Sequence, residues 1–193
     1  MDQELAQCRR LREYATENID DADVRALTFE SALSRGFRAH ENFVEGAFLA
    51  YLVGETTLSG IEVKRFANPP TSEHGRRMVQ GASKFLDWAD PSVVLARCES
   101  FLDADGPLAA AMTGTWNTID WMRRIRNHVS HNSVESMIQY KKVAQVLLLV
   151  DRPDPIRPGD LLQQRPQRGP FKGREILSGL FDGIEAFAIA ATE

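Results

Sequence analysis

The stretch ADVRALTFESALSRGFRAHENFVEGAFLAYLV, residues 22–53, indicates one long helix. Its apolar side chains recur mostly three or four positions apart, at Leu27, Phe29, Leu33, Phe37, Phe43, Ala47, Phe48, Tyr51 and Leu52. This spacing places them along one side of a helix, which Gly36 and Gly46 weaken without ending. A helix of this length and apolar content predicts the central member of a helical bundle.

The same periodicity predicts helices in most of the remaining chain. They cover residues 3–18, 72–88, 91–101, 115–130 and 133–150, with a final helix from about Leu177. Residues 54–70 are predicted to form a long loop or a small hairpin around Ser59-Gly60. Residues 151–172 hold five prolines and are predicted to form an irregular connection.

Short turns between successive helices favour antiparallel neighbours. The predicted fold class is therefore all-α, an up-and-down bundle of four to five core helices with additional short helices. Residues 1–150 are predicted to form the bundle. Residues 151–193 are predicted to add a Pro/Arg-rich connection and a C-terminal helix that packs back on it.

Two of these helices carry finer predictions. In the helix over 72–88, the apolar side predicted is Met78, Ala82, Phe85 and Leu86. Asn132, with Glu135 three residues later, resembles a cap that starts the helix over 133–150. The side chains predicted to face inward from that helix are Val134, Met137, Ile138, Val143, Val146 and Leu147.

The composition fits a single folded domain in a reducing compartment. The chain has 193 residues, of which 43% are apolar, and two cysteines that make no disulfide framework or metal spacing. No apolar run approaches the roughly 18 residues of a membrane span. Residues 1–4 lack the basic and then apolar order of a secretion signal. A cytoplasmic location without membrane association is the expectation.

The charge distribution limits nucleic-acid binding to a local site. The net charge of −4 argues against broad, non-specific coating of nucleic acid. From Gln163 to Arg174, however, there is no carboxylate and four cations, Arg165, Arg168, Lys172 and Arg174. This segment is either a solvated loop or an arm that contacts phosphates.

The segment RRIRNHVSH, residues 123–131, concentrates three arginines and two histidines at the end of a predicted helix. Arginine presents a planar fork of donors that fits phosphate oxygens. Histidine is suited to moving protons near neutral pH. RNA supplies its own nucleophile, the 2′-hydroxyl, so this combination suits metal-independent attack on a phosphodiester.

Arg126-Asn127-His128-Val129-Ser130-His131 resembles the Arg-Asn-x-x-x-His motif of the HEPN domain family. An arginine also precedes a histidine by five residues at Arg35 and at Arg123, but only Arg126 is followed by asparagine. The long helix, with Phe29-Glu30-Ser31 and Glu41-Asn42-Phe43, resembles the first core helix of such domains. The resemblance covers Val24 to Val150.

The resemblance implies metal-independent RNA cleavage that leaves 2′,3′-cyclic phosphate ends, in a toxin or defence role. It implies no cofactor or metal, and two facing copies of the motif in a homodimer. In this mechanism His131 is the general base or acid, and Arg126 stabilises charge in the transition state. Asn127 orients the histidine or a phosphate oxygen. Because five helical residues turn through about 140°, Arg126 and His131 converge only where the helix ends or where both reach a groove.

Other interpretations of these residues stay open. Arg126 and His131 also suit a helix C-terminus, where cations complement the dipole and the last carbonyls. His128, His131 and Glu135 could be considered metal ligands. Trp116 and Trp121 suit core or dimer packing better than base stacking. His40 and His74 are expected at the surface or in caps.

A different class of function is also compatible with the sequence. The bundle could be a non-catalytic adaptor that binds a partner protein, such as a nucleotidyltransferase antitoxin. Replacement of His131 would then change nothing, whereas removal of the Pro/Arg-rich tail would abolish partner binding.

Overall fold

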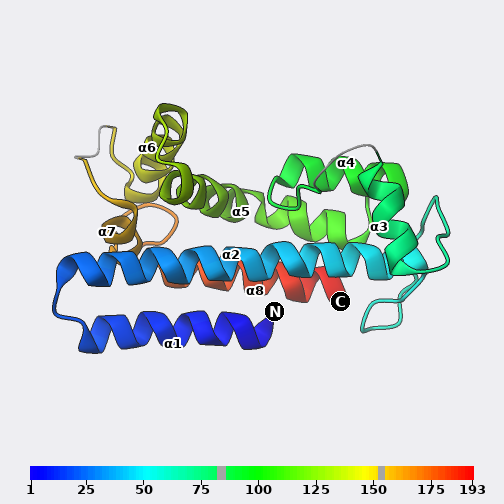
Figure 1. Cartoon of the computed structure of the whole chain (residues 1–193), viewed down its shortest axis with the longest axis horizontal. Coiled ribbons are helices and arrows are strands. Elements are labelled where there is room, and N and C mark those ends of the chain that lie inside the picture. Colours follow the sequence, from blue (N-terminus) through cyan, green and yellow to red (C-terminus); the bar gives the residue numbers. More distant parts are fainter. Residues whose placement is uncertain (82–85, 152–154) are drawn as a thin grey trace. The chain divides into compact units, whose positions relative to one another are not determined.

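The computed structural model describes residues 1–81, 86–151 and 155–193 (Figure 1). Within these ranges the chain is all-α, with eight helices and no named β-strand. The helices are α1 (Asp2–Asn18), α2 (Ala22–Val53), α3 (Ser72–Gln80), α4 (Pro91–Phe101), α5 (Pro107–His131), α6 (Val134–Leu148), α7 (Pro158–Gln163) and α8 (Ile176–Thr192). The prediction of an all-α bundle is confirmed, and α2 has the predicted bounds.

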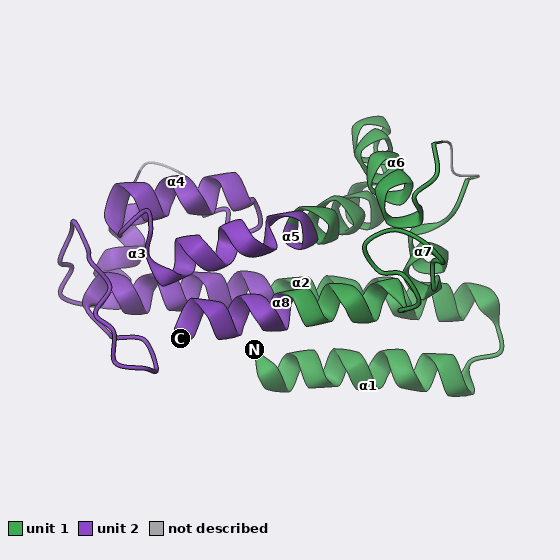
Figure 2. Ribbon diagram, turned by 180° about the vertical axis from the view of Figure 1, so that it is seen from behind, with its two compact units in different colours: residues 1–39, 120–183 green, residues 40–119, 184–193 purple. Residues whose placement is uncertain are grey.

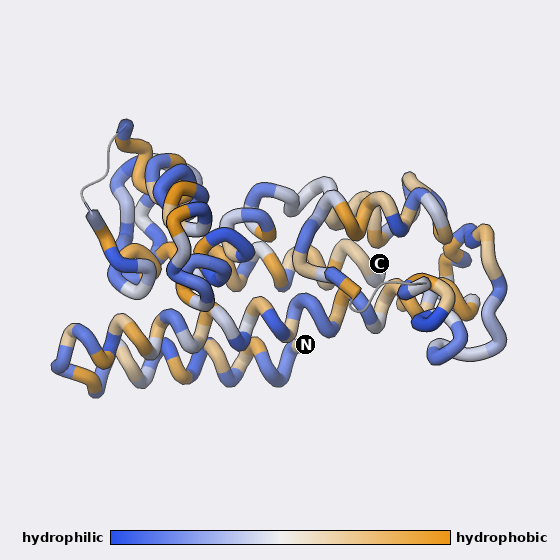
Figure 3. Tube along the Cα trace, turned by 45° about the horizontal axis from the view of Figure 1, so that its top comes forward, coloured by the Kyte–Doolittle hydropathy of each residue, from blue (hydrophilic) through white to orange (hydrophobic). Residues whose placement is uncertain are grey.

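The helices group into two compact units (Figure 2). Unit 1 comprises residues 1–39 and 120–183, and unit 2 comprises residues 40–119 and 184–193. Helices α2, α5 and α8 each contribute residues to both units. Hydrophilic and hydrophobic residues alternate along the helices (Figure 3), as expected for helices with one buried side.

In unit 1, α1 and α8 pack on the first part of α2. Gly36 permits close approach of α8, because a Cβ there would lie 2.6 Å from the Phe181 ring. Helix α1 is tied to α8 by an ion pair of 2.8 Å between Arg9 and Asp182. Arg12 also donates a hydrogen bond of 2.6 Å to the Ser178 hydroxyl.

In unit 2, aromatic contacts hold the second part of α2. The Phe48 ring lies 5.2 Å from Trp88 and 6.4 Å from Phe101, measured between centroids. Residues 54–70 form a loop with two isolated antiparallel bridges, Thr56 with Glu62 and Arg65 with Leu102, and the first of these closes a small hairpin-like turn around Ser59-Gly60. In the described part of the chain, no helix combines the length and apolar content needed to cross a membrane.

The predicted end of α3 and the predicted start of α5 are both wrong, because a glycine ends the first helix early and a proline starts the second one early. Helix α3 ends at Gln80, since Gly81 takes a left-handed conformation with φ of 54° and caps it. Leu86 and Trp88 are therefore not helical, and the predicted positions 82 and 85 lie outside the described residues. Helix α5 starts at Pro107, not Thr115, because proline fits the first turn and the alanines that follow favour helix.

The start of α6 also differs from the prediction. Ser133 is the N-cap, and Ser133 and Ser136 form a reciprocal capping box. Asn132 instead has a φ of 42°, a left-handed conformation that asparagine tolerates. Asn132 therefore ends the helical conformation of α5, and the N-cap of α6 is the next residue, Ser133.

The buried face of α6 was predicted only in part. Val143 and Leu147 are buried as predicted, together with Tyr140 and Ala144. The other side chains predicted to face inward are exposed, namely Val134, Met137, Ile138 and Val146. Helix α6 is apolar on several sides, so periodicity alone did not specify which side packs.

The connection over 151–172 is more ordered than predicted. It contains α7, with Pro158 in the first turn and with Leu161 and Leu162 buried. The backbone of Gly159 lies directly against the Ala26 carbonyl of α2, and its N–H donates to Glu30 Oε1 at 2.9 Å. Proline also fits the first turn of a helix, and Pro158 starts α7 in this way.

Gly159→Ala should destabilise the protein by about 1–3 kcal/mol, because its Cβ would overlap the Ala26 carbonyl. Gly46→Ala is the matched control, since Gly46 lies within α2 and a Cβ there meets nothing within 4 Å. That control should stabilise by about 0.5–1 kcal/mol. Urea unfolding of both variants measures the difference. Equal effects of the two substitutions would contradict this packing of α7.

Candidate functional site

The predicted site lies on a helical hairpin within unit 1, made by the end of α5 and by α6. Only Asn132 and Ser133 separate the two helices. They run antiparallel, because Arg124 Nη1 donates to Gln139 Oε1 at 2.7 Å while His128, one turn later, approaches Ser136. Side chains from both helices therefore meet along one groove.

Asn127 and His131 lie together, whereas Arg126 points elsewhere. Asn127 and His131 are one turn apart on α5 and line the same cleft, of about 470 Å³. Because α5 stays helical through His131, the Arg126 side chain is rotated by about 140° from it. The Arg126 guanidinium lies over the Phe37 ring of α2, 5.3 Å from its centroid. A hydrogen bond of 3.2 Å from Arg126 Nη1 to Asn127 Oδ1 links the Arg126 side chain to the cleft.

The cleft with His131 is polar and is formed by both helices. The residues that line it are Arg123, Arg124, Asn127, His131, Ser133, Glu135, Ser136 and Gln139. The two arginines contribute +2 and Glu135 contributes −1. Asp120, which pairs with both arginines, contributes a further −1, so carboxylates balance the charge of the two guanidinium groups.

Asp120 partly neutralises the two arginines. It lies 2.9 Å from Arg123 and 2.6 Å from Arg124. Gln139 then connects Arg124 to Glu135, since its amide donates to the Glu135 carboxylate at 2.9 Å. This network fixes the guanidinium groups at the cleft, and an anion that enters would compete with Asp120 for them.

The two histidines of the segment occupy different environments. His131 is exposed, at the last residue of α5. His128 is half-buried and stacks on Tyr140, with the ring centroids 4.9 Å apart and the planes at 19°. Burial lowers the pKa of His128, although the carboxylate of Glu30 acts in the opposite direction. His128 is therefore mostly neutral at pH 7.

The metal interpretation finds no support in the side-chain arrangement. His131 lines the polar cleft, whereas His128 lines a separate cavity with Tyr140. Across residues 1–81, 86–151 and 155–193, no three His, Cys, Asp or Glu side chains are grouped so that they could hold a metal ion.

The other predicted positions are distributed over both units. His74 is exposed, and its N–H donates to Thr71 in the cap of α3, as predicted. The surface prediction for His40 is wrong, because this residue is fully buried. Its position on α2 turns the ring toward Phe187. Trp121 packs edge-on against Phe171 at 6.0 Å.

The basic segment of residues 163–174 belongs to unit 1 and exposes most of its cations, whereas Pro166 and Phe171 are buried. Arg165, Arg168 and Lys172 are exposed, and Arg174 pairs with Asp182. Its backbone is anchored, because Ile176 N–H donates to the Gln164 carbonyl at 3.0 Å.

No protein-family model, curated protein or solved structure matches the chain. The resemblance to HEPN domains therefore stays a prediction.

Sequence reasoning missed Arg124 and Gln139 as members of the site. The signal for Arg124 was present, because positions 124, 127 and 131 are three and seven residues apart and share one helix face. Gln139 could not be found in this way, since its position depends on where α6 begins.

Proposed function

We propose that the chain is a metal-independent endoribonuclease of HEPN type that cuts RNA in the cleft of Asn127 and His131. One observation carries the proposal: His131 lies in a cleft with two guanidinium groups and an amide. A proton-transfer group beside phosphate-binding donors is what attack by the 2′-hydroxyl requires.

In the proposed reaction, His131 accepts the proton of the 2′-hydroxyl. The 2′-oxygen forms a bond to phosphorus, the bond from phosphorus to the 5′-oxygen breaks, and the leaving 5′-oxygen takes up a proton from water or from a second histidine. The products carry a 2′,3′-cyclic phosphate and a 5′-hydroxyl. Arg123 and Arg124 stabilise the added negative charge on the phosphate, and Asn127 orients His131 or a phosphate oxygen.

Arg126 takes a less direct role in this proposal. Its guanidinium contacts Phe37 and donates to Asn127, so it holds the asparagine in place. In the resemblance the equivalent arginine stabilises the transition state directly. For Arg126 to do so here, a phosphate would have to bind on the side of α5 where its guanidinium lies over Phe37.

A homodimer is part of the proposal, because one histidine does not readily perform both proton transfers. A second copy would supply a second His131. Exposed apolar side chains on α6 support such an interface, and Val134 and Ile138 lie one turn apart, with 72% and 42% of their surface exposed.

Ile138→Glu should convert the dimer to a monomer, because it places a charge in the proposed interface. Met78→Glu is the matched control, since it adds the same charge at an exposed apolar position of α3. Sedimentation velocity at several concentrations measures both. A monomeric native chain, or a dimer that survives Ile138→Glu, would contradict the α6 interface.

A non-catalytic adaptor is the alternative function. The same exposed apolar side chains of α6 favour it, since they could bind a partner protein such as an antitoxin. A toxin or defence role and a cytoplasmic location are part of the ribonuclease proposal. RNA cleavage separates the two functions.

The test is cleavage of mixed cellular RNA in the presence of EDTA by the native chain and by His131→Ala. The ribonuclease proposal expects cleavage by the native chain that is lost in the variant. No cleavage over a range of RNAs by the folded native chain would favour the adaptor. Cleavage that persists in the variant would exclude His131.

A further inference from the structure

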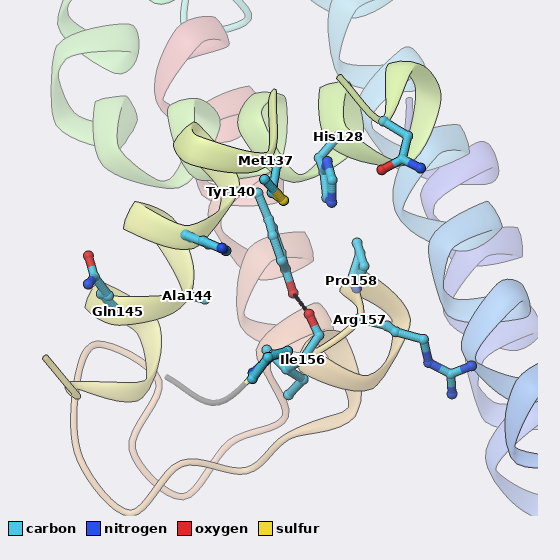
Figure 4. Close-up of a pocket in the computed structure, with 11 residues that line it drawn as sticks. His128, Met137, Tyr140, Ala144, Gln145, Ile156, Arg157 and Pro158 are labelled. Carbon is cyan, nitrogen blue, oxygen red and sulfur yellow. Dashed lines mark hydrogen bonds between the residues drawn. The ribbon is translucent and has the colours of Figure 1, made fainter. Parts of the chain in front are cut away.

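A second cavity of about 600 Å³ lies on unit 1 beside α6 (Figure 4). It is formed by α6, the end of α5 and the segment that precedes α7. Its size lies within the roughly 300–1,000 Å³ that is typical of small-molecule sites. The proposed ribonuclease reaction does not use this cavity.

Two stacked aromatic rings line this cavity, and both are held in place. Tyr140 is buried, and its hydroxyl donates to the Ile156 carbonyl at 2.9 Å (Figure 4). Its ring stacks on His128, whose Nδ1 lies 3.2 Å from the Ser136 hydroxyl. Both rings are therefore held in place before any ligand binds, which lowers the entropic cost of binding.

The remaining wall is mostly apolar. Met137 and Ala144 line the cavity from α6, and Pro155, Ile156 and Pro158 line it from the other side. Since flat rings pack well against aromatic faces, proline and thioether groups, this wall favours a planar ligand.

Lys141 contributes a positive charge to the wall of the cavity. No Asp or Glu is among the described residues that line the cavity, and Lys141 makes no ion pair with any described residue. Arg157 differs, because it pairs with Asp160 at 2.7 Å and with Asp23 at 2.6 Å. Hydrogen bonds to Asp160 and then to Asp23 raise the pKa of Arg157, and Figure 4 shows its guanidinium pointing away from the two rings.

We infer that this cavity binds a small, planar aromatic molecule that carries one anionic group. The ring packs beside His128 and Tyr140, and the anion pairs with Lys141. His128 is mostly neutral at pH 7, so one cation faces one anion. This inference is independent of RNA cleavage.

The test uses two probes of nearly equal shape, 2-naphthoate and the neutral 2-naphthalenemethanol, with binding followed by titration calorimetry or ligand-observed NMR. The native chain should bind 2-naphthoate saturably, with a Kd of about 1 mM or tighter. Lys141→Met should weaken this binding about tenfold and leave the neutral probe unchanged. Lys141 is exposed, so the fold should be retained, and thermal unfolding checks this.

Lys142→Met is the matched control. Lys142 is the next residue of α6, is exposed and does not line the cavity. It should leave the binding of 2-naphthoate unchanged. Absence of saturable binding to the native chain, or equal weakening by the Lys141 and Lys142 variants, would overturn the inference.

Discussion

Acidification from pH 7 to pH 5 should destabilise the protein by about 2 kcal/mol through His40 alone. The His40 side chain is fully buried in unit 2, edge-on to Phe187 with the ring centroids 4.7 Å apart. Burial lowers its pKa to about 3. In the unfolded chain the same group has a pKa of about 6.5.

The direction of the effect follows from these two pKa values. Below about pH 6.5 the unfolded chain binds a proton that the native chain does not accept until about pH 3. His40 therefore does not lower the free energy of unfolding well above pH 6.5. Between about pH 6.5 and pH 3 it lowers this free energy by about 1.4 kcal/mol for each pH unit of acidification.

Urea unfolding at pH 7 and pH 5 measures this loss for the native chain, for His40→Leu and for His74→Leu. His40→Leu should lack about 2 kcal/mol of the pH dependence, because leucine does not titrate. His74→Leu, at an exposed position, should retain the native pH dependence. The same pH dependence in all three proteins would contradict the burial of a neutral His40.

His131→Ala should reduce RNA cleavage by about 10²–10⁴, the usual contribution of general acid–base catalysis. The protein should remain folded, since His131 is exposed at the end of α5. Initial cleavage rates and thermal unfolding, measured on the same preparations, separate chemistry from stability. His74→Ala, which replaces an exposed histidine of α3, should cleave at the native rate.

Two arginine variants test whether the arginine of the cleft, Arg124, or the arginine of the sequence motif, Arg126, contributes more to cleavage. Arg124 lines the cleft with His131, whereas Arg126 lies over Phe37. Arg124→Ala should therefore lower the cleavage rate by roughly tenfold or more relative to the native chain. Arg126→Ala should lower it less. A larger loss in Arg126→Ala, with thermal stability unchanged, would show that RNA binds on the other side of α5.

Most of the helices could be predicted because their signals are local. The spacing of Phe29, Leu33 and Phe37 specified α2, and Pro91 marked the first residue of α4. Boundaries were less certain where one residue type has two roles. Pro107 and Pro158 start helices here, and Gly81 ends one. The presence of proline or glycine alone therefore did not locate the helix boundary.

The candidate site depended more on tertiary structure. Asn127 and His131 could be paired from their spacing on one helix. The divergence of Arg126 follows from the continuation of α5 to His131, which in turn depends on Asn132 adopting a left-handed conformation. The stacking of His128 on Tyr140 joins residues of two helices, and no pattern within one helix predicts it.

The ends of the RNA products report directly on the 2′-hydroxyl as nucleophile. We would digest RNA with the native chain in EDTA and identify both new ends by enzymatic end-labelling and mass spectrometry. Cleavage in the cleft of His131 predicts a 2′,3′-cyclic phosphate on one fragment and a 5′-hydroxyl on the other. Fragments with a 3′-hydroxyl and a 5′-phosphate, or cleavage that appears only when a metal ion is added, would contradict it.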